Sequence, residues 1–478
     1  MSDKYEAVIG LEVHAQLKTE TKIFCGCSAE FGNEPNSNVC PVCLGHPGVL
    51  PVLNKKVVDF SILMGLATQS TINQKSIFAR KNYFYPDLPK GYQISQFELP
   101  ICEFGKIEIE KSNGEKKEIT IKRIHMEEDA GKSIHDQGDE TLVDVNRCGV
   151  PLIEIVSEPD MRTPEEAYLY LSKLKRILTY LDICDGNMEE GSLRCDANIS
   201  IRKKGATELG TRTEVKNMNS FRNVERALQY EIERQIEALE NGEGIVQQTL
   251  LWNADKNEAV PMRGKEEAHD YRYFPEPDLM PVEISNDWIE EIQSALPELP
   301  NEKLNRFMTQ FNLSQYDAEF LTASRGVADY YENIVENTSD YKSASNWMMG
   351  EIAFTLKENK IEIEKLSIPP ENIGKLIELI NGKTISGKIA KEVFAKMLES
   401  RKPPEKIVEE ENLAQITDSS AIENVVEQVL NDNPKQVEQY KSGKESVIGF
   451  FVGQVMRATQ GKANPQLVNQ LLREKLQS

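Results

Sequence analysis

The apolar residues of this 478-residue chain change their periodicity once, near Leu296–Pro300. Before that point, stretches in which every second residue is apolar, typical of half-buried strands, mix with a few helical patterns. After it, the spacing to Ser478 indicates short amphipathic helices. Strands and helices that mix without regular β-α alternation favour an α+β domain over a doubly wound one. We therefore predict an α+β N-terminal part, then an all-α part, with two to four domains in total.

Alternating patterns mark two long strands. Over Tyr5–His14 the odd-numbered residues are apolar, so Glu12 and His14 share the opposite face. Over 193–201 the odd-numbered residues again form the apolar face, and Asp196 lies opposite it. Shorter extended runs are expected at 141–146 and 152–156.

Capping signals mark the helices. Thr163–Glu166 is a capping box with proline at the first helical position. A second helix is predicted from about Ser220 to Leu239, because Asn241–Gly242 is a good C-terminal signal. In the helical half, Ser420–Glu423 is another capping box, and the proline-containing segment 400–404 indicates a hinge between two helical units.

Charge and hydropathy limit the classes of partner. Lys and Arg total 56 against 77 Asp and Glu, and the formal net charge of −21 argues against broad attraction to phosphate backbones. Two segments, 383–402 and 441–478, each carry six basic and two acidic residues; they are either docking sites for a polyanion or solvated surface. No run approaches the roughly 20 apolar residues of a membrane span, and the start lacks a secretory pattern. We expect a cytoplasmic protein.

Four of the eight cysteines fall in one window, as Cys25-Gly-Cys27 and Cys40-Pro-Val-Cys43. Two close thiolate pairs on short turns can form a tetrahedral Zn²⁺ site. Because four protein ligands leave no open position, such an ion would hold structure rather than activate water. Unliganded thiols are the alternative.

Several carboxylates and one histidine on extended segments form a second candidate site. Such groups suit a divalent cation, and a sheet would bring them to one face, where Mg²⁺ assists phosphoryl transfer. Glu154 lies among apolar neighbours, and a carboxylate is costly to bury there unless it has a cation or a metal as partner. The candidates are Glu12, His14, Glu127, Glu128, Glu154 and Asp196.

These candidates have plainer alternatives. Glu12 and His14 can lie on a solvated strand face, and His125–Asp129 can be an exposed acidic turn. Glu154 and Asp196 can belong to an ordinary polar network. A P-loop is excluded: Gly131–Ser133 resembles the end of a Walker A motif, but Met126 stands where the earlier glycine is required. Any ATP site must therefore be of another design.

Two loops combine aromatic rings with cations, Arg80–Tyr92 and His269–Asp278. Rings beside cations can stack on a nucleotide or on the end of a tRNA. The alternative is that each loop packs on its own domain.

Eight motifs together give the sequence a resemblance to a known family. Along its whole length the chain resembles the B subunit of glutamine-dependent aspartyl/glutamyl-tRNA(Asn/Gln) amidotransferases. The motifs are Val8–His14, Arg80–Pro86, Tyr92–Gln96, His125–Lys132, Pro151–Pro159, Glu189–Asn198, Asp270–Asp278 and Gly461–Pro465.

This resemblance implies a three-subunit enzyme. An amidase A subunit would free ammonia from glutamine, and a small C subunit would wrap the A/B pair. The B subunit would use ATP and Mg²⁺ to phosphorylate the side-chain carboxylate of misacylated Asp-tRNA(Asn) or Glu-tRNA(Gln). Ammonia would then displace phosphate and give the amide.

The fold that the resemblance implies has three parts. They are a cradle-shaped α+β catalytic domain with the zinc loop over residues 1–294, a helical domain over 295–405 and a YqeY-like helical tail over 406–478. The tail would hold tRNA.

In-line phosphoryl transfer chiefly needs positioned groups and neutralised charge. On this chemistry we assign His14, Glu128 and Glu154 to Mg²⁺. Glu12, Glu127 and Asp196 would orient water, metal or substrate. Two other hypotheses stay open: that the chain only binds tRNA and scaffolds a catalytic partner, or that it is a zinc-ribbon nucleic-acid protein.

Overall fold

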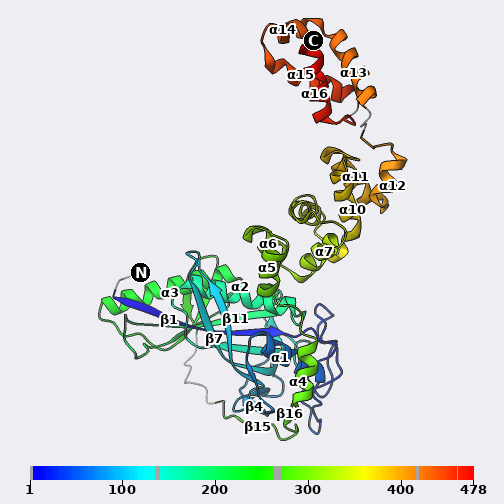
Figure 1. Ribbon diagram of the computed structural model, residues 1–478. Helices are drawn as coiled ribbons and strands as arrows, with labels where there is room; N and C mark the ends of the chain where they lie inside the picture. The colour runs from blue at the N-terminus through cyan, green and yellow to red at the C-terminus, as the bar shows by residue number, and fades with distance from the viewer. Residues whose placement is uncertain (1–3, 135–139, 263–270, 416–418, 460, 478) are drawn as a thin grey trace. The chain divides into compact units, whose positions relative to one another are not determined.

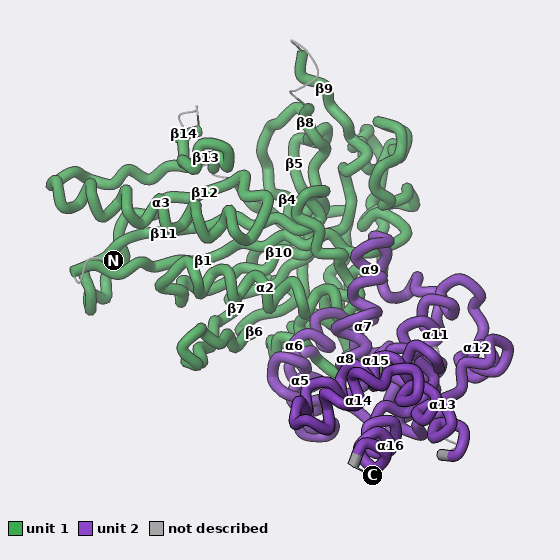
Figure 2. Tube along the Cα trace, turned by 90° about the horizontal axis from the view of Figure 1, so that it is seen from above, with its two compact units in different colours: residues 1–299 green, residues 300–478 purple. Residues whose placement is uncertain are grey.

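The computed structural model describes residues 4–134, 140–262, 271–415, 419–459 and 461–477. They belong to two compact units, unit 1 (residues 1–299) and unit 2 (residues 300–478), which Figure 2 distinguishes by colour. Of the aromatic loop at 269–278, the first two residues lie outside the described residues.

Unit 1 is built on a nine-stranded sheet in the order β14-β13-β12-β11-β1-β10-β7-β6-β2. Figure 2 shows the strands from β14 to β6 following one another in this order. Every neighbouring pair in it is antiparallel except β12 with β13. The strands are β1 (Tyr5–Gln16), β2 (Thr71–Ile72), β6 (Cys102–Glu110), β7 (Lys116–Glu128), β10 (Pro151–Ser157), β11 (Leu193–Lys203), β12 (Thr213–Lys216), β13 (Thr249–Asn253) and β14 (Glu258–Pro261).

Smaller sheets and four helices complete the described part of unit 1 (Figure 1). The sheet β15-β4-β5 lies against the large one, with β5 in contact with β7. The remaining strands are β3 (Lys75–Ser76), β4 (Phe78–Asn82), β5 (Tyr92–Gln96), β8 (Lys132–Ile134), β9 (Leu142–Asp144), β15 (Phe274–Pro275) and β16 (Val282–Glu283). The helices are α1 (Lys55–Ala67), α2 (Pro164–Tyr180), α3 (Phe221–Glu240) and α4 (Asn286–Ser294).

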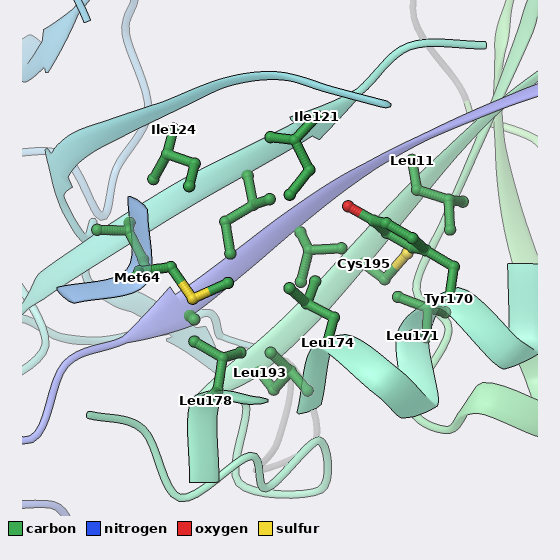
Figure 3. Close-up of a cluster of buried hydrophobic side chains, with 14 of the residues drawn as sticks. Leu11, Met64, Ile121, Ile124, Tyr170, Leu171, Leu174, Leu178, Leu193 and Cys195 are labelled. Atoms are coloured by element: carbon green, nitrogen blue, oxygen red, sulfur yellow. The ribbon is translucent and has the colours of Figure 1, made fainter. Parts of the chain in front are cut away.

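One face of the large sheet is covered by helices. The odd-numbered residues from Ala7 to Ala15 of β1 and from Leu193 to Ile201 of β11 are buried there, as their alternation predicts. In Figure 3, Tyr170, Leu174 and Leu178 of α2 point toward Leu11 of β1 and Leu193 of β11. Burial of this apolar surface fixes the register of the central strands, because a one-residue slip would turn the core residues to the other face.

The opposite face of the sheet carries polar residues in register. Across β1, His14 stands opposite Glu154 of β10 and Arg194 of β11. Glu154 in turn stands opposite His125 of β7. The same pairing that buries the apolar face therefore aligns a histidine, a carboxylate and a second histidine across three neighbouring strands.

Unit 2 is helical and contains two separate hydrophobic cores, one within 307–408 and one within 422–476. Its α-helices are α5 (Pro300–Gln310), α6 (Gln315–Leu321), α7 (Arg325–Val335), α8 (Tyr341–Trp347), α9 (Ala353–Asn359), α10 (Pro370–Asn381), α11 (Gly387–Ser400), α12 (Pro404–Glu410), α13 (Ser419–Asp432), α14 (Pro434–Lys441), α15 (Ile448–Ala458) and α16 (Pro465–Gln477). A π-helical turn covers Met348–Ile352, and 3₁₀ turns cover Ile363–Lys365 and Glu445–Val447.

The predicted α+β class with a helical C-terminal part is confirmed. The caps predicted for α2 and α3 are confirmed as well: Thr163 accepts from the Glu166 backbone N–H at the start of α2, and Gly242 has a positive φ of 78° just past α3. The helix predicted to begin at the Ser420–Glu423 capping box is α13, which already includes Ser419. The extended run predicted at 152–156 lies within β10. Of the extended run predicted at 141–146, only Leu142–Asp144 (β9) is a strand. The division at 294/295 and 405/406 stays a prediction. No helix among the described residues combines the length and apolarity that a bilayer crossing requires.

Candidate functional site

Three predicted residues meet on the polar face of the sheet. One ligand atom each from His14, Glu127 and Glu154 lies within 4.8 Å of the others. The His14 Nε2 atom is 3.4 Å from Glu154 Oε2. One imidazole and two carboxylates are a donor set that suits a divalent cation. We call these three residues the acidic cluster.

A second histidine lies behind the acidic cluster. His125 Nε2 is 3.3 Å from a Glu154 oxygen and 3.5 Å from a Glu127 oxygen. Burial by itself would lower the pKa of His125, but Glu154 and Glu127 outweigh it and raise that pKa to about 9. Burial would raise the pKa of Glu154, yet His125 and His14 hold it well below its ordinary value. Both carboxylates of the cluster are thus kept ionised inside the protein.

Strand β5 and strand β4 support the cluster from the adjoining sheet. The Ser95 hydroxyl donates to Glu127 Oε2 at 2.7 Å, and the Gln93 amide donates to Glu127 Oε1. Burial works against the charge of Lys81, but Glu127 and Glu154 hold its pKa above the ordinary value. The ammonium group therefore stays charged beside the cluster.

Glu128, which was predicted to bind the metal, is not part of this cluster. Its carboxylate pairs with Lys90 and accepts the Ile94 N–H at 2.8 Å. Neighbouring residues of a strand point to opposite sides, so Glu127 and Glu128 cannot both face His14. Glu127 lies in the place that was expected for Glu128. The alternative of an exposed acidic turn at His125–Asp129 is wrong, because this segment is the buried end of β7 and the residue after it.

A cleft of about 740 Å³ opens above the acidic cluster. Its lining includes His14 and Glu127, together with the basic side chains of Lys81, Arg147, Arg194, Lys216 and Arg272. Arg194 and Arg147 are held by Asp129, whose carboxylate lies 2.8 Å and 3.6 Å from them. Burial alone would raise the pKa of Asp129, but these two arginines lower it. The cleft thus combines an acidic floor, whose ligand atoms suit a cation, with cationic walls.

Asp196 and Glu12 lie beside the cluster, each with its own partner. Asp196 lines the cleft and accepts from Lys216 at 3.1 Å. Glu12 accepts from Asn198 at 2.9 Å. Burial, and then the nearby Glu154 carboxylate, raise the pKa of Glu12.

The two aromatic loops meet at the rim of the cleft, where β4 pairs with β15. Arg80 lies 2.7 Å and 2.8 Å from the Glu276 carboxylate and stacks on Tyr92, so this part packs on its own domain. Phe84 and Tyr85, in contrast, line the cleft with 86% and 55% of their surface exposed. These two rings are free to stack on a ligand.

The four cysteines of the zinc motif converge, with their sulfur atoms within 4.8 Å of one another. The Lys22 ammonium lies 3.7 Å from Cys43 Sγ and donates to the Asn38 carbonyl. A hydrogen bond from Cys25, aided by Lys22, lowers the pKa of Cys43 to about 4. This cluster is compatible with Zn²⁺, and the Ile23 N–H joins its loop to Gly149, just before β10.

Sequence reasoning missed the partners that come from other strands. His125 carried a usable signal, since it lies two residues before Glu127 and so shares its strand face. The sequence carries no such signal for Lys81, Gln93 and Ser95, because only the packing of β5 on β7 brings their sheet to the cluster.

Comparison with known proteins identifies the family. A family model described as "GatB/GatE catalytic domain" matches residues 7–290, more than half of the chain, and a model described as "GatB domain" matches residues 329–476. The chain belongs to the GatB family.

Relatives named as the B subunit of aspartyl/glutamyl-tRNA(Asn/Gln) amidotransferase align with nearly the whole chain. The protein from Chlorobaculum tepidum is 59% identical over 472 residues, which cover 99% of each chain. The one from Thermodesulfovibrio yellowstonii is 58% identical over 469 residues, or 98% of each chain. The one from Geobacter sulfurreducens is 58% identical over 476 residues, or 99% of each.

Cys40→Ser tests the zinc cluster. Loss of one of four ligands removes binding energy that is also folding energy, so we expect less bound zinc and a melting temperature lower by several degrees. Metal analysis and calorimetry measure the two quantities. Cys102→Ser, at a buried cysteine outside the cluster, is the control that keeps zinc. Loss of RNA binding by Cys40→Ser without loss of stability would favour a zinc-ribbon nucleic-acid protein instead.

Proposed function

We propose that this chain is the B subunit of an amidotransferase that converts misacylated Asp-tRNA(Asn) or Glu-tRNA(Gln) to Asn-tRNA(Asn) or Gln-tRNA(Gln). In this proposal it phosphorylates the side-chain carboxylate with ATP and hosts the attack of ammonia. The observation that carries the proposal is the acidic cluster on the floor of a cleft with basic walls. Full-length identity of 58–59% to proteins of that name supports it.

The chemistry explains why such a site is needed. A carboxylate oxygen leaves poorly, so the substrate carboxylate first attacks the γ-phosphorus of ATP and ADP departs. In the resulting acyl phosphate the leaving group is phosphate. Ammonia then attacks the acyl carbon, phosphate departs, and the nitrogen loses a proton to give the amide. The first step needs close positioning of two anions, which nearby cations permit.

His14, Glu127 and Glu154 are the residues that would hold Mg²⁺, since they fit a divalent cation in donor type and spacing. A bound Mg²⁺ would neutralise phosphate charge and orient the transferring group. The protein contributes the rest: Ser95 and Gln93 fix the Glu127 carboxylate, and His125 fixes Glu154. Glu12 and Asp196 would orient water or substrate from the edge of the cluster, while Glu128 would keep Lys90 in place.

Lys81, Arg194 and Lys216 supply positive charge where the reaction brings two anions together. Each is charged, since neighbouring carboxylates raise all three pKa values despite burial. The exposed rings of Phe84 and Tyr85 would stack on the terminal bases of the tRNA and present the aminoacyl group to the cleft.

The partners belong to the same proposal. An A subunit with amidase activity would deliver ammonia, a small C subunit would complete the heterotrimer, and ATP, Mg²⁺ and a structural Zn²⁺ would be the cofactors. The domains would be a catalytic cradle (1–294), a helical domain (295–405) and a YqeY-like tail (406–478) that holds tRNA.

The two basic segments, 383–402 in the helical domain and 441–478 in the tail, are partly neutralised by internal ion pairs. Lys391 pairs with Glu351, Lys402 with Glu410, and Lys475 with both Glu423 and Glu427. The contribution of these two segments to tRNA binding therefore depends on their other basic residues, above all those in α14–α16.

Glu154→Gln tests catalysis by this chain. The neutral amide keeps the shape but weakens cation binding and loses the charge between the two histidines, so tRNA-dependent ATP hydrolysis by the assembled enzyme should fall on the order of 100-fold or more. Binding of tRNA should persist. Glu118→Gln, at an exposed glutamate of the neighbouring strand β7, is the matched control. Unchanged turnover in Glu154→Gln would show that the chain is a tRNA-binding scaffold.

Removal of residues 416–478 tests the tail. The second hydrophobic core of unit 2 is deleted while the first core stays complete, so the rest of the chain should fold. We expect the affinity for tRNA to fall on the order of tenfold, with glutaminase activity of the complex unchanged. A filter-binding titration at fixed salt measures the affinity, and an intact affinity would refute this role.

A further inference from the structure

Lys22 is a fully buried lysine beside the four cysteines of the zinc motif. None of its surface is exposed, although lysine is almost never fully buried in proteins unless it is paired. Its Nζ atom lies 3.7 Å from Cys43 Sγ and donates to the Asn38 carbonyl at 2.7 Å. Among the described residues no carboxylate forms an ion pair with it. The sulfur atoms of the cysteine cluster are therefore the groups that can offset its charge.

The charge of a metal-loaded cysteine cluster needs such a cation. Four thiolates around one Zn²⁺ leave two negative charges uncompensated. Cys43, the buried member of the four, also accepts a hydrogen bond from the Cys40 N–H at 3.2 Å. Donors around the ligand atoms of a metal orient them, and loss of such a donor typically lowers metal affinity by roughly 10- to 100-fold. The ammonium of Lys22 is a second donor to Cys43, and it also carries a compensating charge.

Lys22 also lies where the cysteine loop meets the central sheet. Its side chain packs against Gly149, where an added Cβ atom would lie 3.5 Å from Lys22 Cδ and 3.5 Å from Cys43 Cβ. The Lys22 N–H donates to the Cys27 carbonyl at 2.9 Å, and the next residue, Ile23, donates its N–H to the Gly149 carbonyl at 2.9 Å. One short segment thus bonds to the cysteine cluster on one side and to the residue before Val150 on the other.

Gly149 extends this connection to the wall of the cleft. Its N–H donates to the Asp129 carbonyl at 2.9 Å, and the Asp129 N–H donates to the Val150 carbonyl at 2.8 Å. The Asp129 carboxylate lies 2.8 Å from Arg194 and 3.6 Å from Arg147. A shift of the cysteine loop would therefore move the backbone that anchors two of the cationic side chains of the cleft.

We propose that Lys22 is the charge partner of the zinc-loaded cysteine cluster and that it couples metal binding to the position of the Asp129 backbone. With zinc bound, its ammonium offsets the charge of the thiolates and holds the cysteine loop against Gly149. Without zinc, the same ammonium is a buried charge with a weaker partner, and the hydrogen bond from Ile23 to Gly149 opens more often. Lys22 is a positioning residue, because it acts on the cleft through Gly149 and Asp129. The inference rests on the part of the proposed function that puts Zn²⁺ in the cluster.

Lys22→Met in the full-length chain tests the charge, since methionine keeps an unbranched side chain and removes the ammonium. Competition with a chromogenic chelator should show zinc binding weakened roughly tenfold or more. Calorimetry should show a smaller difference between the melting temperatures of zinc-loaded and zinc-stripped protein, with the stripped variant no less stable than the stripped wild type. A lysine that only fills space would instead lower both melting temperatures equally. Lys18→Met, at an exposed lysine paired with Asp182, is the control with unchanged zinc affinity.

Amide hydrogen exchange on the wild type tests the connection without any variant. Removal of zinc by a chelator should speed exchange in peptides that contain 22–24 and 147–150, while a peptide of α2 that contains 170–178 stays protected. Equal exchange at 147–150 with and without zinc would overturn the coupling, and a zinc affinity of Lys22→Met equal to that of the wild type would overturn the charge role; the proposed function would stand in both cases. Purified wild type without zinc would refute the zinc part of the proposed function, and this inference with it.

Discussion

The burial of two carboxylates between two histidines is the constraint on which the rest of unit 1 depends. Glu127 is 2% exposed and Glu154 6%, and ionised groups are costly at such depth unless they have partners. The protein supplies these partners from β1, β4, β5 and β7. With Glu154 on β10, the site is assembled from five strands and requires each register to be correct. The helix-covered apolar face of the large sheet fixes the registers of its central strands.

The sequence predicted those parts of this arrangement that follow from the apolar periodicity of a single strand. Alternation in β1 and β11 placed Glu12, His14 and Asp196 on the polar face, and an apolar run identified Glu154 as a carboxylate in need of a partner. Which of Glu127 and Glu128 faces the cluster could not be predicted. That choice depends on a register shift between β7 and β10 at Val156–Ser157, which no single-strand pattern reveals.

The same limit applies to the walls of the site. Lys81 and Ser95 come from a second sheet whose packing on β7 has no sequence period, and the cationic character of the cleft follows only from that packing. The zinc motif is the opposite case. Its ligand spacing is local, so four cysteines in one window were enough to predict a cluster that the fold brings together.

Each part of the sheet has a separate task in the proposed reaction. The central strands hold the acidic cluster, and the β4–β15 edge carries the exposed rings that would stack on the tRNA end. Two anionic substrates would meet over this cluster, and in-line phosphoryl transfer needs such positioned groups and neutralised charge.

Titration with Mn²⁺, followed by the electron paramagnetic resonance of the unbound ion, decides whether the acidic cluster binds a divalent cation. In the proposed function, His14, Glu127 and Glu154 would form the cation site, and the neighbouring Glu128 lies outside their cluster. We expect Glu127→Gln to lose the bound ion and Glu128→Gln to retain it. Loss of the ion in Glu128→Gln, with full binding in Glu127→Gln, would contradict this assignment.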